Sequence, residues 1–434
     1  MKNQEMNYLE GFKNHHATEA VSNTLPIGQN SPQKVNHGLY AEQLSGTSFT
    51  TPRSENLRTW LYRIRPSVVH PRFEVTSIDS ILTAPCETLA TGPNQYRWNP
   101  LDLNHSGDDF IRGTHTLLVT GNWQRQEGLA VHLYSCDSSM NQSVYANHDG
   151  ELIILPEQGT LKIKTEMGQL IVAPLEIAVI PKGIKFQIHV EGSSRGYVGE
   201  NYGHSLQLPE LGPLGSNGLA NPRDFLAPVA WYEDKAQSHE LLVKSQGRHW
   251  LTELDHSPFD VVGWHGNLYP YKYDLRRFNT IGSISFDHPD PSIFTVLTSP
   301  TDSKGVTNLD FVIFPPRWLV QENTFRPPWY HRNIMSEYMG LLKGVYDAKT
   351  EKGGFIPGGG SLHNSYAAHG PDANAFEAAS EMDLKPQKLD QTMAFMFETR
   401  YPFELTSFAT QKGLLQDNYQ DCWKDLKSKF NPVQ

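Results

Sequence analysis

The chain has few cysteines, no long apolar stretch and no excess of basic residues. Its three cysteines, Cys86, Cys136 and Cys422, are far apart and odd in number. This argues against a disulfide framework or a cysteine-rich zinc site and favours a reducing cytoplasm. No apolar run approaches the roughly 20 residues that a membrane-spanning helix needs, and the N-terminal stretch lacks the apolar core of a secretory signal. The net charge of -10 argues against nucleic-acid binding through phosphate neutralisation. We therefore expect a cytoplasmic protein that binds neither membrane nor nucleic acid.

Turn-forming and aromatic residues are plentiful instead, with 34 glycines, 29 prolines and 11% aromatic residues in 434 positions. A chain of this length has room for two or three domains, and this composition is typical of many short strands. From residue 114 onward, apolar runs alternate with turn residues. The sequence predicts strands over 116–120, 129–134, 151–155, 160–164, 170–172, 177–180 and 186–190. Strands at this spacing predict a β-sandwich or barrel, so we expect a mainly all-β fold.

Two patches in this region resemble those of a cupin, a small jelly roll. They are His148-Asp-Gly-Glu151 and Pro181-Lys-Gly-Ile-Lys-Phe186. The second patch lacks the histidines that a cupin metal site needs. We therefore expect a degenerate, structural cupin-like region that holds no metal.

The remaining segments are less regular. Four more strands are predicted, over 294–297, 311–314, 339–346 and 393–397. We expect a partly helical segment over 239–256 and a C-terminal helix over 413–430, where apolar residues fall near helical spacing. The Pro/Gly-rich connection over 209–235 is long for a loop inside one domain. We expect this connection and the polar N-terminal arm at contacts between subunits.

The candidate metal-binding residues are concentrated between Tyr330 and Gly370. His331 precedes Glu337 by six positions, and both come before two further histidines, His363 and His369. Two imidazoles and one carboxylate are the minimal ligand set of a facial iron(II) site, which leaves positions open for substrate and dioxygen. Six residues span about 20 Å along a strand, and on a helix they point to different sides. The chain must therefore reverse between His331 and Glu337 if both bind one metal.

The third ligand is not fixed by spacing. The glycine run 358–360 would start a separate strand, because glycine permits a close backbone approach there. A generic cupin pattern of Pro, Gly and then His would select His363, whereas His369 fits the spacing equally well. The chain holds 18 histidines, so a chance pairing of histidine with carboxylate is also a reasonable reading.

Long motifs along nearly the whole chain resemble the homogentisate 1,2-dioxygenase family. They are Gly38-Leu-Tyr-Ala-Glu-Gln-Leu-Ser-Gly-Thr47, Trp60-Leu-Tyr-Arg-Ile64, Asn147-His-Asp-Gly-Glu151, Phe286-Asp-His-Pro-Asp-Pro-Ser-Ile-Phe-Thr295, Phe314-Pro-Pro-Arg-Trp318, Tyr330-His-Arg-Asn-Ile-Met-Ser-Glu-Tyr-Met-Gly340, Pro357-Gly-Gly-Gly-Ser-Leu-His363 and His369-Gly-Pro-Asp-Ala373. The resemblance implies a β-rich N-terminal domain over 1–275, with its extended arm and degenerate cupin-like region. It also implies a C-terminal, cupin-like jelly-roll iron domain over 276–434, and a hexamer built as a dimer of trimers.

The resemblance also implies an activity. Such an enzyme opens the ring of homogentisate with both atoms of dioxygen, giving 4-maleylacetoacetate, in the breakdown of tyrosine and phenylalanine. The implied cofactor is Fe(II), with His331, Glu337 and His369 as ligands and His288 as the acid/base residue. Tyr346 and His363 match positions near the substrate.

The substrate carboxylate needs local donors on a chain with this negative charge. Asn333, Arg332 and Arg317 are candidates for this role through their proximity in sequence alone. Two alternatives of other classes remain at this stage. One is a catalytically silent cupin-like protein that binds a sugar or an aromatic ligand, and the other is a metal-dependent cupin enzyme such as an isomerase.

Overall fold

A computed structural model describes residues 7–103, 107–303, 305–346, 348–349 and 354–432. The chain forms two compact units. The first comprises Met1–Cys86, Asp102–Leu206 and Ala220–Arg277, and the second comprises Glu87–Leu101, Gln207–Leu219 and Phe278–Gln434. Each unit is thus assembled from three stretches that are separate in the sequence. The division into an N-terminal domain over 1–275 and a C-terminal domain over 276–434 stays a prediction. Within the described ranges, no helix is long and apolar enough to cross a membrane.

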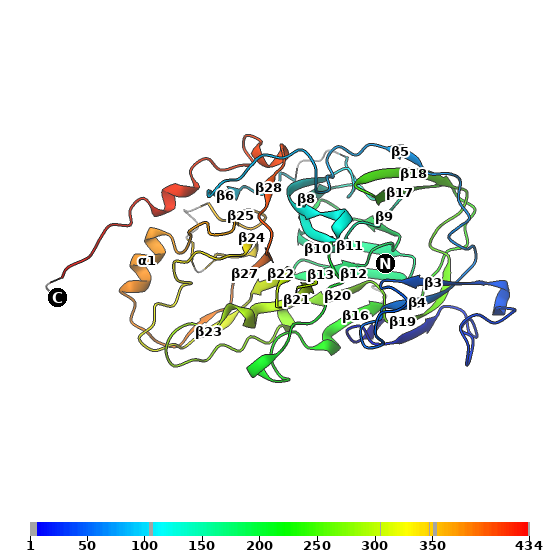
Figure 1. Ribbon diagram of the computed structural model, residues 1–434, viewed down its shortest axis with the longest axis horizontal. Coiled ribbons are helices and arrows are strands. Elements are labelled where there is room, and N and C mark those ends of the chain that lie inside the picture. The colour runs from blue at the N-terminus through cyan, green and yellow to red at the C-terminus, as the bar shows by residue number, and fades with distance from the viewer. Residues whose placement is uncertain (1–6, 104–106, 304, 347, 350–353, 433–434) are drawn as a thin grey trace. The chain divides into compact units, whose positions relative to one another are not determined.

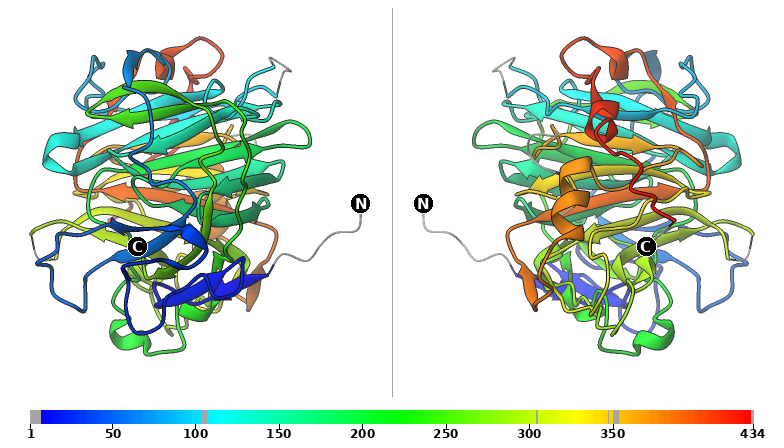
Figure 2. Two further views of the ribbon diagram at one scale, coloured as in Figure 1. Left: turned by 90° about the vertical axis from the view of Figure 1, so that its right-hand side faces the viewer. Right: turned by 90° about the vertical axis from the view of Figure 1, so that its left-hand side faces the viewer.

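The first unit is built from three largely antiparallel sheets. In one sheet the strands follow the order β1 (Tyr8–Glu10), β16 (Phe225–Pro228), β20 (Tyr271–Asp274), β13 (Glu176–Ile180), β10 (Glu151–Gln158), β15 (Ser194–Asn201), β8 (Glu127–Cys136) and β7 (Thr114–Asn122). A seven-stranded sheet has the order β12 (Gly168–Val172), β11 (Leu161–Thr165), β14 (Phe186–His189), β9 (Ser143–Asn147), β17 (His239–Ser245), β18 (Arg248–Leu254) and β5 (Glu74–Thr76). A four-stranded sheet has the order β2 (His16–Glu19), β19 (Val261–Gly266), β4 (Arg58–Arg63) and β3 (Tyr40–Ser45). Figure 2 shows these neighbouring strands from two further sides.

The strands predicted between residues 116 and 190 are confirmed, because their apolar residues fill the interior of this unit. The alternation is clear in β11, where Leu161, Ile163 and Thr165 are buried and Lys162 is exposed. β7 and β8 form a hairpin in which Gly121 and Gly128 face each other with positive φ. A Cβ on either glycine would overlap the backbone of the other strand, so only glycine permits this approach.

The helix expected over 239–256 is wrong, because this segment is the hairpin of β17 and β18. Ser245 pairs with Arg248, and the two residues between them, Gln246 and Gly247, have φ of 58° and 69°. Positive φ at both central residues is the signature of a type I′ turn, which fits the twist of a two-residue hairpin. The turn therefore overrides the weak helical spacing of the flanking apolar residues.

The second unit is built around a six-stranded antiparallel sheet. Its order is β21 (Thr295–Pro300), β22 (Thr307–Phe314), β27 (Met393–Thr399), β24 (Ser336–Lys343), β25 (Gly360–His363) and β6 (Gln95–Trp98) (Figure 1). The other strands described in this unit are β23 (Arg317–Leu319) and β26 (Gln387–Leu389), which form a two-stranded sheet, and the short β28 (Glu404–Leu405). Its described residues also form the α-helix α1 (Ala373–Ser380) and several short 3-10 turns. The fold is mainly β, as the sequence predicts.

The core of this second sheet lies beneath one of its faces. It consists of Val312, Met339, Leu341, Tyr346, Ala348, Phe355, Ala394 and Met396. These residues come from three neighbouring strands and from the connection after β24, so the sheet and that connection share one apolar cluster.

The C-terminal helix expected over 413–430 is also wrong. In this range the structure has one 3-10 turn, over Tyr419–Trp423. Tyr419 is buried and its ring packs against that of Trp423, with centroids 5.0 Å apart. Most residues that follow are exposed, so a longer helix would have no apolar face to bury.

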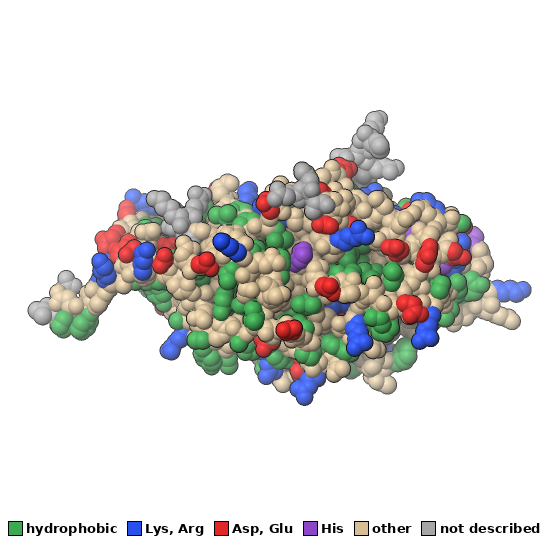
Figure 3. Space-filling view, turned by 90° about the horizontal axis from the view of Figure 1, so that it is seen from above, with side chains coloured by type: hydrophobic (Ala, Val, Ile, Leu, Met, Phe, Trp, Pro, Cys, Tyr) green, Lys and Arg blue, Asp and Glu red, His purple; other side chains and the backbone are tan. Residues whose placement is uncertain are grey.

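The surface carries charges of both signs. On the face seen in Figure 3, basic and acidic side chains are interspersed among polar and apolar ones. The net charge of -10 is therefore not gathered into one patch on this face.

Candidate metal centre

A backbone bridge brings two histidines together beside the sheet of the second unit. The amide of His331 donates to the carbonyl of His369 at 2.9 Å, and the amide of His369 donates back to His331 at 3.1 Å. Their imidazole rings lie 4.1 Å apart between centroids. His331 precedes β24 and His369 follows β25, so two segments 38 positions apart in sequence, from 331 to 369, place these rings side by side.

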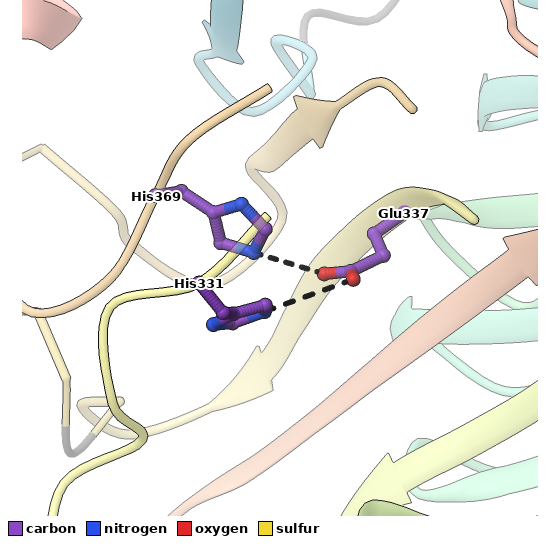
Figure 4. A group of neighbouring side chains, drawn as sticks. All are labelled: His331, Glu337 and His369. Carbon is purple, nitrogen blue, oxygen red and sulfur yellow. Dashed lines mark hydrogen bonds and ion pairs between the residues drawn. The ribbon is translucent and has the colours of Figure 1, made fainter. Parts of the chain in front are cut away.

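Glu337 supplies a carboxylate to the same point from the second position of β24. Its Oε2 lies 3.1 Å from Nε2 of His369, and its Oε1 lies 3.8 Å from Nε2 of His331 (Figure 4). One ligand atom from each of the three residues falls within 4.8 Å of the others. Glu337 is buried, whereas both histidines are half-buried.

The hydrogen bonds of the imidazoles fix which nitrogen faces the carboxylate. Nδ1 of His331 contacts the carbonyl of Trp329 at 2.8 Å, and Nδ1 of His369 contacts the carbonyl of Ala367 at 2.9 Å. A carbonyl only accepts, so each Nδ1 carries the hydrogen and each Nε2 of a neutral ring points a lone pair at Glu337. The two Nε2 lone pairs and the negative carboxylate repel one another, so this arrangement is favourable only when a proton or a cation lies between them. Metal-binding histidines are held by this same pattern of backbone bonds, so the residues fit a divalent metal.

The electrostatics keep Glu337 ionised. Burial acts to raise the pKa of this carboxyl, but His331 and His369 outweigh it and hold the pKa well below its usual range. The Glu337 charge in turn raises the pKa of His331. The carboxylate is therefore ready to act as an anionic ligand.

A second carboxylate, Glu398, lies beside the first. The side-chain amide of Asn333 donates to Oε1 of Glu337 and to Oε1 of Glu398, both at 2.8 Å. Burial and the neighbouring Glu337 charge raise the pKa of Glu398 to about 7. Asn333 thus holds the inner carboxylate in place through an atom that no titration alters.

The three residues open onto a pocket of about 370 Å³. Much of its wall is apolar, formed by Phe294, Phe314, Trp329, Met339, Phe355 and Met396. Such a cavity with a few convergent polar groups is the usual form of a site for a small molecule.

The other residues predicted for the site all line this pocket. His288 is half-buried with its ring 5.4 Å from that of Trp329. Tyr346 packs its ring 5.6 Å from that of Phe314. The substrate and acid/base roles of His288, Tyr346, His363 and Asn333 stay predictions.

His363 lies behind His369, outside the group of three. Its ring stacks on that of His369 with centroids 3.9 Å apart, and its Nε2 contacts the hydroxyl of Tyr419 at 2.7 Å. Burial, together with His369, lowers the pKa of His363 well below its usual range. A neutral ring fixed in this way supports the orientation of His369.

Of the arginines proposed from proximity, Arg317 and Arg332 line the pocket, and Arg332 is exposed. Four ionisable residues that line the pocket were not predicted from the sequence, namely Arg97, Lys349, Glu398 and Tyr419. Two of them carried a detectable signal, since Arg97 and Glu398 are charged residues within or next to apolar strand segments. Such positions are uncommon without a partner or a function.

Fold and site together define the class: a β-sheet protein with a two-histidine, one-carboxylate group suited to a divalent metal. Residues 7–275 match the family described as Homogentisate 1,2-dioxygenase N-terminal, and residues 276–430 match Homogentisate 1,2-dioxygenase C-terminal. The chain belongs to the homogentisate 1,2-dioxygenase family, and it is an enzyme.

Curated relatives cover almost the full chain. Homogentisate 1,2-dioxygenase of Pseudomonas entomophila is 55% identical over 429 residues, which is 99% of this chain and 98% of the relative. That of Pseudomonas putida is 56% identical over the same shares. Among solved structures, a mutant of Bacillus subtilis oxalate decarboxylase is 12% identical and covers 71% of this chain and 78% of its own, with a TM-score of 0.31.

Proposed function

We propose that the chain opens the aromatic ring of homogentisate with both atoms of dioxygen, giving 4-maleylacetoacetate, in the breakdown of tyrosine and phenylalanine. The observation that carries the proposal is the group of His331, Glu337 and His369 at the wall of an apolar pocket. Family membership over residues 7–430 supports the choice of substrate.

The proposed cofactor is a single iron(II) ion held by Nε2 of both histidines and by the Glu337 carboxylate. When bound, iron(II) would leave positions open for substrate and dioxygen and would supply the electron exchange that ring cleavage requires. The protein contributes position and proton transfer. Asn333 and the two backbone carbonyls hold the three ligands in one orientation, which limits the reorganisation needed when a cation binds.

His288 is the proposed acid/base residue. It lines the pocket together with the three ligands, and the edge-to-face contact with Trp329 restrains its ring. The ordinary pKa of imidazole suits removal of a phenol proton near neutral pH. The apolar walls around it limit access of water to the reacting ring.

Oxygen consumption tests the proposal. Protein loaded with iron(II) under anaerobic conditions should take up oxygen when homogentisate is added, with a rise in absorbance from the ring-opened product. Catechol and protocatechuate should give little, because their two hydroxyls are adjacent and neither compound has the acetate side chain that homogentisate carries next to one hydroxyl. If catechol were cleaved as fast as homogentisate, the substrate assignment would fail and only the dioxygenase class would remain.

The same experiment separates the other candidate classes. A silent binding protein would show ligand binding without oxygen uptake, and an isomerase would convert a substrate without oxygen. The hexameric assembly and the cytoplasmic location expected from the sequence stay predictions. If light scattering gave the mass of a monomer for fully active protein, the prediction of a hexamer would be wrong.

A further inference from the structure

The floor of the pocket is the sheet of β27, β24, β25 and β6, and its side chains lie in rows across the strands. One row holds Glu398, Glu337 and His363, which are register partners on β27, β24 and β25. The next row in register, two residues along each strand, is formed by Met396, Met339, Ser361 and Arg97. All seven residues line the pocket. Two residues along a strand cover about 7 Å, so the second row lies roughly that far from the metal ligands.

The second row changes in chemistry from one side to the other. Its two methionines are apolar and adaptable, which suits contact with a flat ring. Its far end is Arg97, which is fully buried. The guanidinium carbon of Arg97 lies 3.7 Å from the centre of the Tyr419 ring. Packing against that ring holds the guanidinium in one position.

A second buried cation, Lys349, stands beside Arg97. Its Nζ donates to the carbonyl of Gly370 at 2.6 Å and lies 4.2 Å from the centre of the Trp423 ring. Its backbone amide donates to Tyr346 at 3.2 Å, which ties this position to the pocket wall. Nζ also contacts Sγ of Cys422 at 4.0 Å. The bonds to Gly370 and Cys422 use two of the three ammonium hydrogens, so Lys349 keeps one donor for a ligand.

Two neighbouring buried cations favour an anion between them. Burial lowers the pKa of Lys349 to about 8, and the Arg97 charge adds to this effect. Cys422 and Asp372 oppose this lowering of the pKa. The carboxylate of Asp372 is also engaged elsewhere, since it accepts the amide of Ala375 at 2.7 Å as the N-cap of α1. A carboxylate arriving in the pocket would meet a guanidinium and an ammonium that are already held in place.

We propose that Arg97 and Lys349 form the subsite for the side-chain carboxylate of the substrate. The aromatic ring then lies over Met339 and Met396, and its hydroxyl reaches the row of metal ligands. The span between the two rows matches a ring with one methylene group. This inference rests on the proposed function, since it names how the same pocket selects a dihydroxyphenylacetate over a plain dihydroxybenzene.

The experiment compares two ligands that differ in one group. Homogentisate and 2,5-dihydroxytoluene share the ring and both hydroxyls, but only the first has a carboxylate. Binding of each to the anaerobic, metal-loaded protein is measured by calorimetry, apart from turnover. Lys349→Met should weaken homogentisate binding by about 10- to 100-fold, the usual loss when one charge-assisted hydrogen bond is removed. The same change should leave binding of the toluene unaltered.

Two matched variants complete the design. Lys343→Met removes an exposed lysine at the end of β24 outside the pocket, and it should alter neither affinity. Lys349→Arg keeps the charge and should restore much of the homogentisate affinity. In steady state, Lys349→Met should raise KM for homogentisate far more than it lowers kcat.

The outcomes are distinct. Equal losses for both ligands in Lys349→Met, or no loss for either, would overturn the subsite. Unchanged homogentisate binding would place the carboxylate elsewhere, for example on the metal itself. Tight homogentisate binding that depends on Lys349, without any oxygen uptake in the wild type, would retain the subsite and reject the proposed reaction.

Discussion

Glu337 and Glu398 lie directly opposite each other on the antiparallel strands β24 and β27, and one side-chain amide, that of Asn333, donates to both. Their surroundings separate the pKa values of the two carboxyls, since the pKa of Glu337 is held well below its usual range while that of Glu398 is raised to about 7. One carboxylate is thereby committed to the charged form, and the other tolerates a proton near neutral pH.

Asn333 is therefore expected to control metal affinity without being a ligand. Asn333→Ala removes the donor that fixes Oε1 of Glu337, and loss of such an outer contact typically costs about 10- to 100-fold in metal affinity. Competition with a chelator of known affinity measures the change. An affinity equal to that of the wild type would show that Glu337 is positioned by its strand alone.

Metal content tests the ligand set itself. His331→Ala, Glu337→Ala and His369→Ala should each lose the bound iron, which elemental analysis should find at one ion per chain in the wild type. Circular dichroism should stay native-like, because the apolar cluster beneath the sheet does not include these residues. His363→Ala serves as the comparison. Full iron in His369→Ala together with loss in His363→Ala would make the ligand assignment wrong.

His288→Phe should separate metal binding from proton transfer. We expect full iron content and a fall in turnover of about 10²- to 10⁴-fold, the usual contribution of a general acid or base. His70→Phe is a matched control, because His70 is also followed by proline but is exposed and belongs to the first unit. Turnover that survives in His288→Phe would indicate a purely structural histidine.

The first unit contains a buried ion pair whose loss should be costly. Nζ of Lys244 lies 2.5 Å from both carboxylate oxygens of Glu200, which also contacts Nε2 of His132 at 3.1 Å and Nδ2 of Asn147 at 2.7 Å. Both charged side chains are almost fully buried. Lys244→Met leaves the Glu200 charge without its cation, so the free energy of unfolding should fall by about 3–5 kcal/mol.

Urea denaturation measures this loss. Lys162→Met, which removes an exposed lysine of β11, should change stability by less than about 0.5 kcal/mol. The double variant Lys244→Met with Glu200→Gln should regain part of the loss, because no uncompensated charge remains. Equal stabilities of Lys244→Met and Lys162→Met would show that the pair contributes nothing.

His249, the register partner of Lys244 on β18, should make stability depend on pH. Burial and the Lys244 charge lower the pKa of His249 to about 4, whereas the unfolded chain takes up this proton near the ordinary imidazole value of about 6.5. The unfolded state therefore binds more protons between these values, and stability falls as the pH is lowered from about 6.5 towards 4.

Comparison with His249→Phe isolates this effect. Between pH 7 and pH 5 the wild type should lose about 2 kcal/mol more than the variant, since each pKa unit of difference is worth about 1.4 kcal/mol. Urea titrations at the two pH values provide the measurement. Parallel losses in both proteins would mean that His249 is protonated as readily in the fold as in water.

The sequence by itself determined the elements whose pattern is local. Apolar and polar residues alternate with period two over β11, whereas β13 is an apolar run bounded by turn residues. Both patterns indicate strands with at least one buried face, so the mainly β fold follows without knowledge of any partner. The pair Gln246-Gly247 carried the hairpin signal as well, and the helix expected over 239–256 arose from giving apolar spacing more weight than that turn. The motifs around His331 and Glu337 likewise led to the family, because they are long and contiguous.

Only the tertiary structure decided which distant residues share the pocket. Spacing alone left His363 and His369 equivalent, and the backbone bridge between residues 331 and 369 turns His369 toward Glu337 and leaves His363 stacked behind it. Arg97 and Glu398 reach the same wall because β6 and β27 join β25 and β24 in one sheet. A strand's own residues fix its period and its buried face, but its neighbours in the sheet are selected by contacts with remote parts of the chain, which no local pattern records.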